Sequence, residues 1–343
     1  MADQVLDFLY FKNEVSIFLQ KNVKKIKASK TTYTKEEGEV WDKLLGLNRG
    51  KVLRGSLVCY GFTLNKRIKK LPKDVLLVAA ALELSHLALL IHDDIIDDSA
   101  QRRGQLALHK QYPRAGKELA LCAGDMALMF AFGLIGKLNS CENAELITKK
   151  LSEELARVCA GQMQDIRLSV PNNKPGKAQI MQLMRCKTAG YSIALPLQLG
   201  AILAGCEEEV QNSLYKFGLA AGTIYQIQDD ELGIFGNTTS IGKPVGDDIR
   251  QAKQTLLYYY LQEAVSPKIT ERLNSIFGNP GASELDIDYV RTEMVRHNVS
   301  ASIRNDIKRL ERQAWAETAA LELDKYEKQG LNRLIKFCSD RLA

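Results

Sequence analysis

Apolar residues recur at helical spacing along almost the whole of this 343-residue sequence, while the alternation of β-branched residues that marks strands is nearly absent. The periodicity predicts an all-α fold, and a hydrophobic content of 45% suffices for a large buried core. The gaps between the predicted helices are short and contain no low-complexity linker, which favours a single domain over residues 1–343. We expect helices over 3–27, 36–46, 51–66, 74–100, 116–138, 143–168, 177–206, 208–234, 248–264, 284–296, 298–320 and 324–340.

Two of these helices have unusual sequences. Pro196 lies inside YSIALPLQLGAILAG and predicts a kink, because a proline in a helix interior removes a backbone hydrogen bond. Residues 119–138, LALCAGDMALMFAFGLIGKL, are apolar on nearly every face, which predicts burial all round, in the centre of the protein or in a subunit interface. No apolar run reaches the roughly 18 residues of a membrane span, so we expect no integral membrane segment.

Charge and cysteine content exclude several classes of protein. The net charge of +6, from 47 basic and 41 acidic residues, is too small to indicate a nucleic acid partner. The seven cysteines are odd in number and form no CxxC pair, so neither a zinc site nor a disulfide framework is predicted. The N-terminus, MADQVLDFLYFKNEV, has acids where a signal peptide has bases. These features favour a reducing cytoplasm.

The most charged stretch is 83–104, ELSHLALLIHDDIIDDSAQRRG, an apolar helix that ends in four aspartates. At about 100° per residue, Asp93 and Asp97 lie one turn apart on one face, and Asp94 and Asp98 form a second such pair. Like charges at this spacing repel by roughly a few tenths of a kcal/mol, and a hard cation such as Mg²⁺ would remove the repulsion. The alternative is a solvated acidic helix end without a ligand.

A second acidic stretch, YQIQDDELGIFG at 225–236, repeats this arrangement, with Asp229 and Asp230 following another apolar helix. If the two sites face each other across a cavity, they would bind several divalent ions. A polyanion is then needed to balance the ions, and a diphosphate is the natural candidate.

Basic side chains near both stretches fit a phosphate ligand, because guanidinium and ammonium groups are its usual protein partners. Lys51 and Arg54 are three residues apart, so both project from one helix face. His86 lies close to two turns before Asp93 and on the same face. Taken singly, each group is also compatible with a solvated surface charge or, for His86, with a core histidine. The other members of the set are Arg102, Arg103, Lys187 with the adjacent Thr188, Lys243 and Lys253.

In order, these motifs resemble those of the trans-type isoprenyl diphosphate synthases, over roughly Gly50 to Thr255. The matching segments are GKVLR, the histidine ahead of the first acidic motif, DDIIDDSAQRRG, AGD at 123–125, GQMQD at 161–165, KT, YQIQDD, GKPVGDD and Lys253. The resemblance implies an all-α isoprenoid synthase fold, a helix bundle around a deep central cavity, usually as a homodimer. It also implies head-to-tail prenyl transfer.

The resemblance also implies a role for each matched position. The metal ligands, for three Mg²⁺ ions bridging an allylic diphosphate, would be Asp93, Asp97 and Asp229, with Asp94 counted among the catalytic residues of the motif. The groups that contact this diphosphate would be Arg102, Lys187 and Lys243, with Lys253 nearby. The isopentenyl diphosphate site would comprise Lys51, Arg54, His86 and Arg103. The groups beside the reacting carbons, where they would stabilise cationic charge, are Thr188 and Gln226.

The sequence departs from the family pattern at two positions. Val52 stands where many members have an arginine, which leaves the first basic motif one cation short. Gly233 stands where the second motif usually has its third aspartate, so that Asp229 lacks an i+4 partner. Glu231 cannot replace it, because it lies about 200° around the helix from Asp229.

Taken together, the sequence predicts a Mg²⁺-dependent prenyltransferase that joins isopentenyl diphosphate to an allylic diphosphate. A non-catalytic partner subunit of a heteromeric synthase and a terpene cyclase are the alternatives, and the basic residues of a second diphosphate site argue against the cyclase. The resemblance places a product tunnel beside the helix ahead of Asp93, with Ala88 and Leu89 in its wall. By helix geometry Ser85 lies one turn below Leu89 and could also line the tunnel, and Phe130 or Phe132 on the next helix are candidates for deeper stoppers. Since no aromatic residue closes the tunnel early, we expect a twenty-carbon product, geranylgeranyl diphosphate, with fifteen or twenty-five carbons as the near alternatives.

Overall fold

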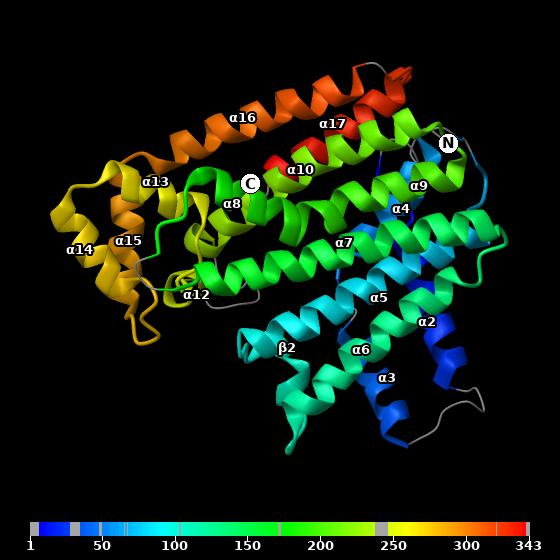
Figure 1. The fold of residues 1–343 in the computed structure, drawn as a ribbon, viewed down its shortest axis with the longest axis horizontal. Coiled ribbons are helices and arrows are strands. Elements are labelled where there is room, and N and C mark those ends of the chain that lie inside the picture. The colour runs from blue at the N-terminus through cyan, green and yellow to red at the C-terminus, as the bar shows by residue number, and fades with distance from the viewer. Residues whose placement is uncertain are drawn as a thin grey trace. The chain divides into compact units, whose positions relative to one another are not determined.

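The computed structural model describes residues 7–27, 35–47, 50–64, 66, 68–102, 104–170, 173–236, 246–319 and 321–340. Within these ranges the regular structure is helical except for one antiparallel pair of two-residue strands (Figure 1). These are β1 (Gln101–Arg102) and β2 (Gln105–Leu106), with Gln101 opposite Leu106. The predicted all-α class is therefore confirmed.

The helices of the described residues have the following bounds. They are α2 (Lys12–Lys27), α3 (Lys35–Leu47), α4 (Leu53–Thr63), α5 (Lys73–Ile96), α6 (Gly116–Ile135), α7 (Cys141–Leu168), α8 (Lys177–Met184), α9 (Leu195–Ala204), α10 (Glu208–Phe235), α12 (Asp247–Arg250), α13 (Leu256–Ala264), α14 (Pro267–Ile276), α15 (Glu284–Arg296), α16 (Val299–Thr318) and α17 (Lys325–Ser339). A 3-10 turn, η1 (Leu108–Lys110), follows β2, and a π-helical segment, η2 (Arg185–Ala194), joins α8 to α9.

Two predicted helices differ from the observed ones, and one observed helix was not predicted. The helix predicted over 177–206 contains the π-helical η2, and Pro196 comes just after it, as the second residue of α9. The helix predicted over 248–264 is broken between α12 and α13, because Ala252 has a φ of 54°, in the left-handed region that ends a helix. Helix α14, which begins with Pro267, was not predicted.

The chain divides into two compact units, each assembled from separate segments of the sequence. Unit 1 comprises Met1–Leu151, Pro196–Asn212 and Leu323–Leu331. Unit 2 comprises Ser152–Leu195, Ser213–Glu322 and Asn332–Ala343. The single domain over 1–343 stays a prediction.

The core of unit 1 is built around α5, which packs against α2, α4 and α6 (Figure 1). Residues 75–85 of α5 are buried without interruption, because the helix is apolar on every side, and all of α4 is buried as well. Helix α5 therefore forms a rigid support for the acidic residues at its C-terminal end.

By length and composition alone, α5 and α6 are each apolar enough to cross a membrane. The most apolar window of α5 is 83% buried inside the protein, as expected of a core helix, whereas that of α6 is 39% buried. On α6, Leu121 and Met129 are 50% and 66% exposed. The single chain therefore does not bury this helix all round, and of the two predicted alternatives the subunit interface stays a prediction.

In unit 2, α13 packs against α8, α15 and α16. A buried polar cluster links three of these helices: Lys177 Nζ donates to Asp306 Oδ1 at 2.7 Å and to the Tyr260 hydroxyl, which in turn donates to Asp306 Oδ2. Burial would lower the pKa of Lys177, but its hydrogen bonds with Asp306 and Tyr260 hold it above its usual value. The cluster therefore stabilises the packing of α8, α13 and α16.

Candidate active site

The first acidic cluster lies at the C-terminal end of α5. Asp97 follows the last helical residue and its amide donates to the Asp93 carbonyl at 2.8 Å, so the two residues stay one turn apart, as predicted. The chain leaves the helix at Asp98, which has a φ of 48°. The predicted continuation of the helix to residue 100, and with it the helical pairing of Asp94 and Asp98, is therefore wrong.

Asp94 is paired with Arg102 of β1. Arg102 Nε donates to both carboxylate oxygens of Asp94, at 2.9 and 3.1 Å, and Nη2 donates to Asp94 Oδ1 and, at 3.4 Å, to Asp93 Oδ2. The Asp94 side chain is 4% exposed. Burial alone would lower the pKa of the Arg102 guanidinium, but the hydrogen bonds and charge of Asp94 raise it above its usual value. The charge of Asp94 is thus neutralised within the protein.

Asp98 is exposed and pairs with lysines instead. Its Oδ1 lies 2.9 Å from Lys117 Nζ and 3.2 Å from Lys110 Nζ, and these hydrogen bonds lower the pKa of the Asp98 carboxyl. The four aspartates therefore separate into two pairs. Asp94 and Asp98 each have a cationic partner, and Arg102 also reaches Asp93 at 3.4 Å. Asp93 and Asp97 keep the one-turn spacing of two metal ligands.

The basic residues predicted for the second substrate lie on α4 and α5. Lys51 is exposed just before α4, and Arg54 is buried in its first turn. The amide of Gly55 donates to Glu83 Oε1 at 2.8 Å, which fixes this turn of α4 beside α5, one turn before the half-buried His86. The structure therefore brings Lys51, Arg54 and His86 into one region of unit 1. Arg103 lies outside the described residues.

The predicted tunnel wall occupies the same helix. Ser85 and Ala88 are buried, and Leu89 is half-buried one turn before Asp93. The Ser85 hydroxyl donates to the Ala81 carbonyl at 2.9 Å, so its hydrogen-bonding capacity is directed back to its own helix. The Ser85 side chain would therefore present mostly its methylene group to a hydrocarbon chain beside it.

The second acidic cluster lies near the end of α10, in unit 2. Gln226 Nε2 donates to Asp230 Oδ1 at 2.6 Å. Burial, followed by the nearby charges of Asp248 and Asp229, raises the pKa of Asp230 well above its usual value. Glu231 is buried on another side of the helix, where it accepts hydrogen bonds from Gln228 at 3.0 Å and Ser300 at 3.4 Å. Glu231 thus does not replace the aspartate missing at Gly233, as the sequence indicates.

Lys187 and Thr188 lie on the π-helical segment η2. The Lys187 ammonium forms a hydrogen-bonded ion pair with Asp165 of α7, and Thr188 is half-buried. Beside them, a Cβ atom on Gly190 would lie 1.8 Å from Glu154 Oε1, so only glycine fits there. Wide π-helical turns often occur at functional sites, because they redirect side chains away from the regular helical positions.

The structure only partly describes the basic residues after α10. Lys243 lies outside the described residues. Lys253 is half-buried after α12, where its amide donates to the Asp248 carbonyl at 2.9 Å and its charge lowers the pKa of Asp230. Lys253 therefore lies close to the second acidic cluster, as predicted.

The donor set of the two clusters suits a hard divalent cation. In the described residues, no group of three or more histidine, cysteine or carboxylate side chains forms a complete metal site by itself. Asp93 and Asp97 in one cluster, and Asp229 in the other, offer only carboxylate oxygens, the ligand type that Mg²⁺ prefers. Burial is the main cause of the raised pKa of Asp230, followed by the charges of Asp248 and Asp229. The residues present therefore fit Mg²⁺.

Comparison with known families decides the assignment. Residues 38–294, well over half of the chain, match the polyprenyl synthetase family. The chain belongs to this family. It is therefore a trans-prenyltransferase, an isoprenyl diphosphate synthase, and the family, fold and reaction predicted from the sequence are confirmed.

Individual polyprenyl synthetases extend the comparison. The short chain isoprenyl diphosphate synthase of Methanocaldococcus jannaschii is 31% identical over 281 residues, which cover 81% of this chain and 83% of that protein. Heptaprenyl diphosphate synthase component 2 of Bacillus subtilis is 31% identical over 209 residues, covering 61% and 57%. The geranylgeranyl pyrophosphate synthase of Corynebacterium glutamicum, solved with isoprenyl diphosphate and magnesium, is 28% identical, with a TM-score of 0.89 over 98% of this chain and 100% of that chain.

The structure adds residues that the sequence analysis did not assign to the site. Asp165 pairs with Lys187, Glu154 occupies the space beside Gly190, and Asp248 lies near Asp230. Two of them lie in segments already noted in the sequence, GQMQD and GKPVGDD. Glu154 follows a surface-like pattern of charges in α7, and no sequence signal distinguishes it. The roles of the individual site residues remain predictions.

Proposed function

We propose that this polyprenyl synthetase is Mg²⁺-dependent and condenses isopentenyl diphosphate with an allylic diphosphate to give geranylgeranyl diphosphate. The observation that carries the proposal is the separation of the first acidic motif into two pairs. Arg102 and the lysines neutralise Asp94 and Asp98, while Asp93 and Asp97 keep the spacing of metal ligands. A purely solvated acidic helix end has no need of a half-buried arginine paired with a buried aspartate.

In this proposal Asp93, Asp97 and Asp229 hold three Mg²⁺ ions. When bound, the ions supply the positive charge that stabilises the allylic diphosphate as a leaving group. Arg102 would have a second role, because the guanidinium that supports Asp94 also reaches Asp93 at 3.4 Å and so would help to orient this carboxylate. The groups that contact the same diphosphate would be Arg102, Lys187, Lys243 and Lys253.

Gln226 and Thr188 would stabilise the allylic cation. The amide nitrogen of Gln226 donates to Asp230, which leaves the amide oxygen as the end that accepts or faces positive charge. A fixed dipole of this kind stabilises charge without reorganisation during the reaction. Thr188 lies on the π-helical segment η2, and in this proposal its side chain would also face the allylic cation.

Isopentenyl diphosphate would bind to Lys51, Arg54, His86 and Arg103. The Gly55–Glu83 hydrogen bond holds the first turn of α4 beside α5 and so presents the cations of α4 close to His86. Because Lys51 is exposed and Arg54 is only 9% exposed, Lys51 would contact the diphosphate near the protein surface and Arg54 would contact it deeper in the protein. The double bond then attacks the cation, and the released diphosphate takes up the proton that is lost.

The position of the aromatic residues on α6 supports the proposed product length. His92 Nε2 lies 3.3 Å from the Leu121 carbonyl and Asn139 Nδ2 donates to Asp74 at 2.9 Å, so α5 and α6 run antiparallel. By interpolation, Phe130 lies level with about residue 83 of α5, roughly 15 Å from Asp93 along the helix.

Phe130 is held there by Trp41 of α3, a fully buried side chain, in an edge-to-face contact with ring centroids 4.7 Å apart. This pair would close the tunnel about half a turn beyond Ser85. That depth exceeds the early closure of a fifteen-carbon enzyme and supports a twenty-carbon product. Leu89 and Ala88 would form the side wall above it, with Ser85 at the lower end.

We further propose that the enzyme is a homodimer in which α6 forms part of the interface. The exposed positions Leu121, Asp125, Met129 and Gly133 recur at four-residue intervals and form one stripe along α6. An apolar helix left with such a face in the single chain is typical of a subunit interface. All seven cysteines are free thiols, which fits the reducing cytoplasm that we propose as its location.

A heteromeric synthase is the second candidate, because the Bacillus subtilis relative is one component of a heptaprenyl synthase. In that case this chain would need another protein for activity. The predicted ligands and basic residues of the described chain, however, would suffice for both diphosphates. We therefore expect activity from the purified chain alone.

The test is incorporation of radiolabelled isopentenyl diphosphate by the purified chain with Mg²⁺ and primers of five, ten, fifteen and twenty carbons. We expect incorporation that chelation of Mg²⁺ abolishes, with a main product of twenty carbons on chromatography after extended incubation. No incorporation with any primer would refute the proposed function. A main product of thirty carbons or more would refute the proposed length alone.

A further inference from the structure

The second acidic motif lacks its third aspartate at Gly233, yet a carboxylate lies at that position. A Cβ atom on Gly233 would lie only 2.6 Å from Asp248 Oδ2. Because Gly233 follows Asp229 by one turn on the same face of α10, the Asp248 carboxylate lies on that face, about 6 Å further along the helix. A side chain from α12 thus occupies the space that an aspartate at 233 would fill.

The backbone fixes this arrangement. The amide of Gly246 donates to the Gly233 carbonyl at 3.2 Å, which joins the start of α12 to the last turn of α10. Gly246 has a φ of 89°, and a Cβ atom there would lie 2.9 Å from Ile287 Cγ2. Only glycine therefore allows α12 to approach α10 at this point.

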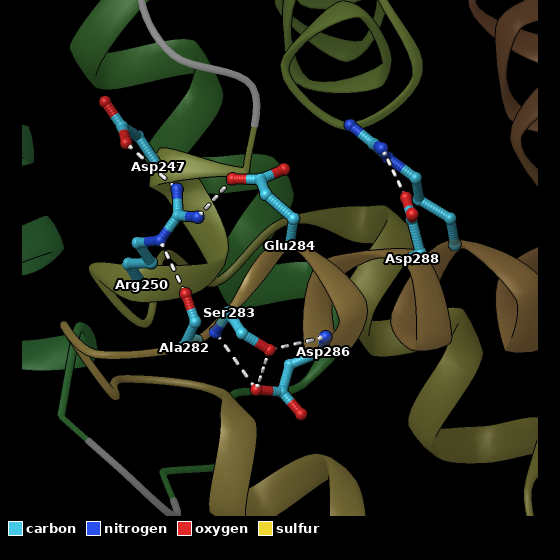
Figure 2. Close-up of polar contacts among 8 residues, drawn as sticks. Asp247, Arg250, Ala282, Ser283, Glu284, Asp286 and Asp288 are labelled. Carbon is cyan, nitrogen blue, oxygen red and sulfur yellow. Dashed lines mark hydrogen bonds and ion pairs between the residues drawn. The ribbon is translucent and has the colours of Figure 1, made fainter.

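Arg250 anchors the other end of α12, as Figure 2 shows. Its Nε donates to the Ala282 carbonyl at 3.1 Å, and its Nη2 donates to Glu284 Oε1 at 2.8 Å. Its Nη1 lies 3.5 Å from Asp247 Oδ1, so Asp247 is turned towards Arg250. The two neighbouring aspartates of GKPVGDD therefore differ in role: Asp247 takes part in the anchor, and Asp248 lies beside Gly233.

The surroundings of Asp248 are those of a ligand rather than of a structural carboxylate. In the part of the chain that the structure describes, Asp248 has no hydrogen bond or ion pair through its side chain. Its Oδ2 instead lies beside Gly233, on the face of α10 that also carries Asp229. At this place the Asp248 carboxylate is available to a cation held by Asp229.

We propose that Asp248 supplies the carboxylate that Gly233 lacks and completes the Mg²⁺-diphosphate site at Asp229. The inference rests on the proposed function and extends it to a residue outside the aspartate-rich motif. It also accounts for Gly233, which leaves room for the carboxylate from α12. Asp229, Asp230 and Asp248 together supply as many carboxylates as a motif with three aspartates. Asp248, however, comes from α12 rather than from α10.

The assignment can be tested by moving the carboxylate from position 248 to position 233. Isothermal titration calorimetry, with Mg²⁺ and inorganic diphosphate as the probe, measures the binding of diphosphate. Asp248→Asn, which keeps shape and removes charge, should weaken Mg²⁺-dependent diphosphate binding by about tenfold or more. Asp247→Asn, the matched neighbour, should change it less than about twofold. In an Asp248→Gly background, Gly233→Asp should recover most of the lost affinity, because it moves the carboxylate from α12 to α10. Gly233→Asp alone should weaken binding, since two carboxylates then compete for one space.

The outcomes separate this inference from the proposed function. If the wild type binds diphosphate with Mg²⁺ and forms product, but Asp248→Asn binds as well as the wild type, only the assignment of Asp248 fails. Failure of Gly233→Asp to recover binding in the Asp248→Gly background, with the melting temperature unchanged, also overturns the assignment. If the wild type neither binds diphosphate with Mg²⁺ nor forms product, the proposed function itself fails.

Discussion

The ion pair between Asp94 and Arg102 is expected to be the main electrostatic support of the first acidic motif. We consider Asp94→Asn, which keeps the shape of the side chain and removes its charge. In the wild type, Arg102 makes hydrogen bonds at 2.9 and 3.1 Å through Nε and another through Nη2, and the Asp94 and Arg102 side chains are 4% and 17% exposed. After the substitution, the buried guanidinium keeps only Asp93, at 3.4 Å, as a charged hydrogen-bonding partner in the described residues.

Removing one partner of a buried ion pair costs about 3–5 kcal/mol. Since asparagine retains one acceptor oxygen and Asp93 remains within reach, we expect the lower end, about 3 kcal/mol. With a urea dependence of about 3 kcal/mol per molar, the midpoint of unfolding should fall by about 1 M. Equilibrium unfolding followed by circular dichroism at 222 nm measures this shift.

Two controls sharpen the experiment. Asp98→Asn makes the same chemical change at a side chain that is 60% exposed, and its unfolding midpoint should stay near that of the wild type. Adding Arg102→Met to Asp94→Asn should recover part of the loss, because no buried charge then lacks its partner. An Asp94→Asn midpoint equal to that of the wild type would show that the pair does not support the motif.

The remaining predictions concern catalysis, pH, product length and assembly. Asp93→Ala and Asp229→Ala should each remove most activity at saturating Mg²⁺ while the far-ultraviolet circular dichroism is unchanged, because each deletes a ligand worth several kcal/mol of barrier; near-normal turnover would show the ligand assignment to be wrong. Asp230→Ala should reduce activity less, since Asp230 points about 100° away from Asp229. Burial raises the pKa of Asp230, so the folded chain binds this proton more tightly than the unfolded chain. Without Mg²⁺, the melting temperature should therefore fall as the pH rises through that pKa, and Asp230→Asn should remove this component. Leu89→Phe should shorten the product and Leu89→Ala should lengthen it, as read by chromatography; unchanged products would exclude Leu89 from the wall. Met129→Glu should convert a dimer to a monomer in light scattering, and an unchanged dimer would place the interface elsewhere.

Helical periodicity predicted most of the fold, because long amphipathic and apolar segments determine helices by themselves. It could not predict η2, since a π-helical segment of only 10 residues is too short to show its wider i→i+5 turn in the spacing of apolar residues. The break after α12 depends on Ala252 in a left-handed conformation, which alanine rarely adopts and which the surrounding packing imposes. Both η2 and the break after α12 therefore depend on tertiary structure.

The site could be predicted as far as its residues follow motifs within single helices. The spacing of Asp93 and Asp97 is a local property, and the structure retains it. The separate pairing of Asp94 with Arg102 and of Asp98 with lysines depends on where the chain turns after α5. The position of Asp248 beside Gly233 depends on a contact between α12 and α10, and the sequence shows only that the third aspartate of the motif is replaced by glycine. Contacts of this kind have no local signature.

The central proposal is that Asp93, Asp97 and Asp229 bind the metal ions of one diphosphate. Anomalous diffraction from crystals grown with Mn²⁺ and an allylic thiolodiphosphate, whose bridging sulfur resists ionisation, tests it most directly. The account predicts manganese peaks bound by Asp93 and Asp97 and by Asp229, all in contact with the same diphosphate. Manganese bound without these carboxylates, or diphosphate bound without manganese, would contradict it.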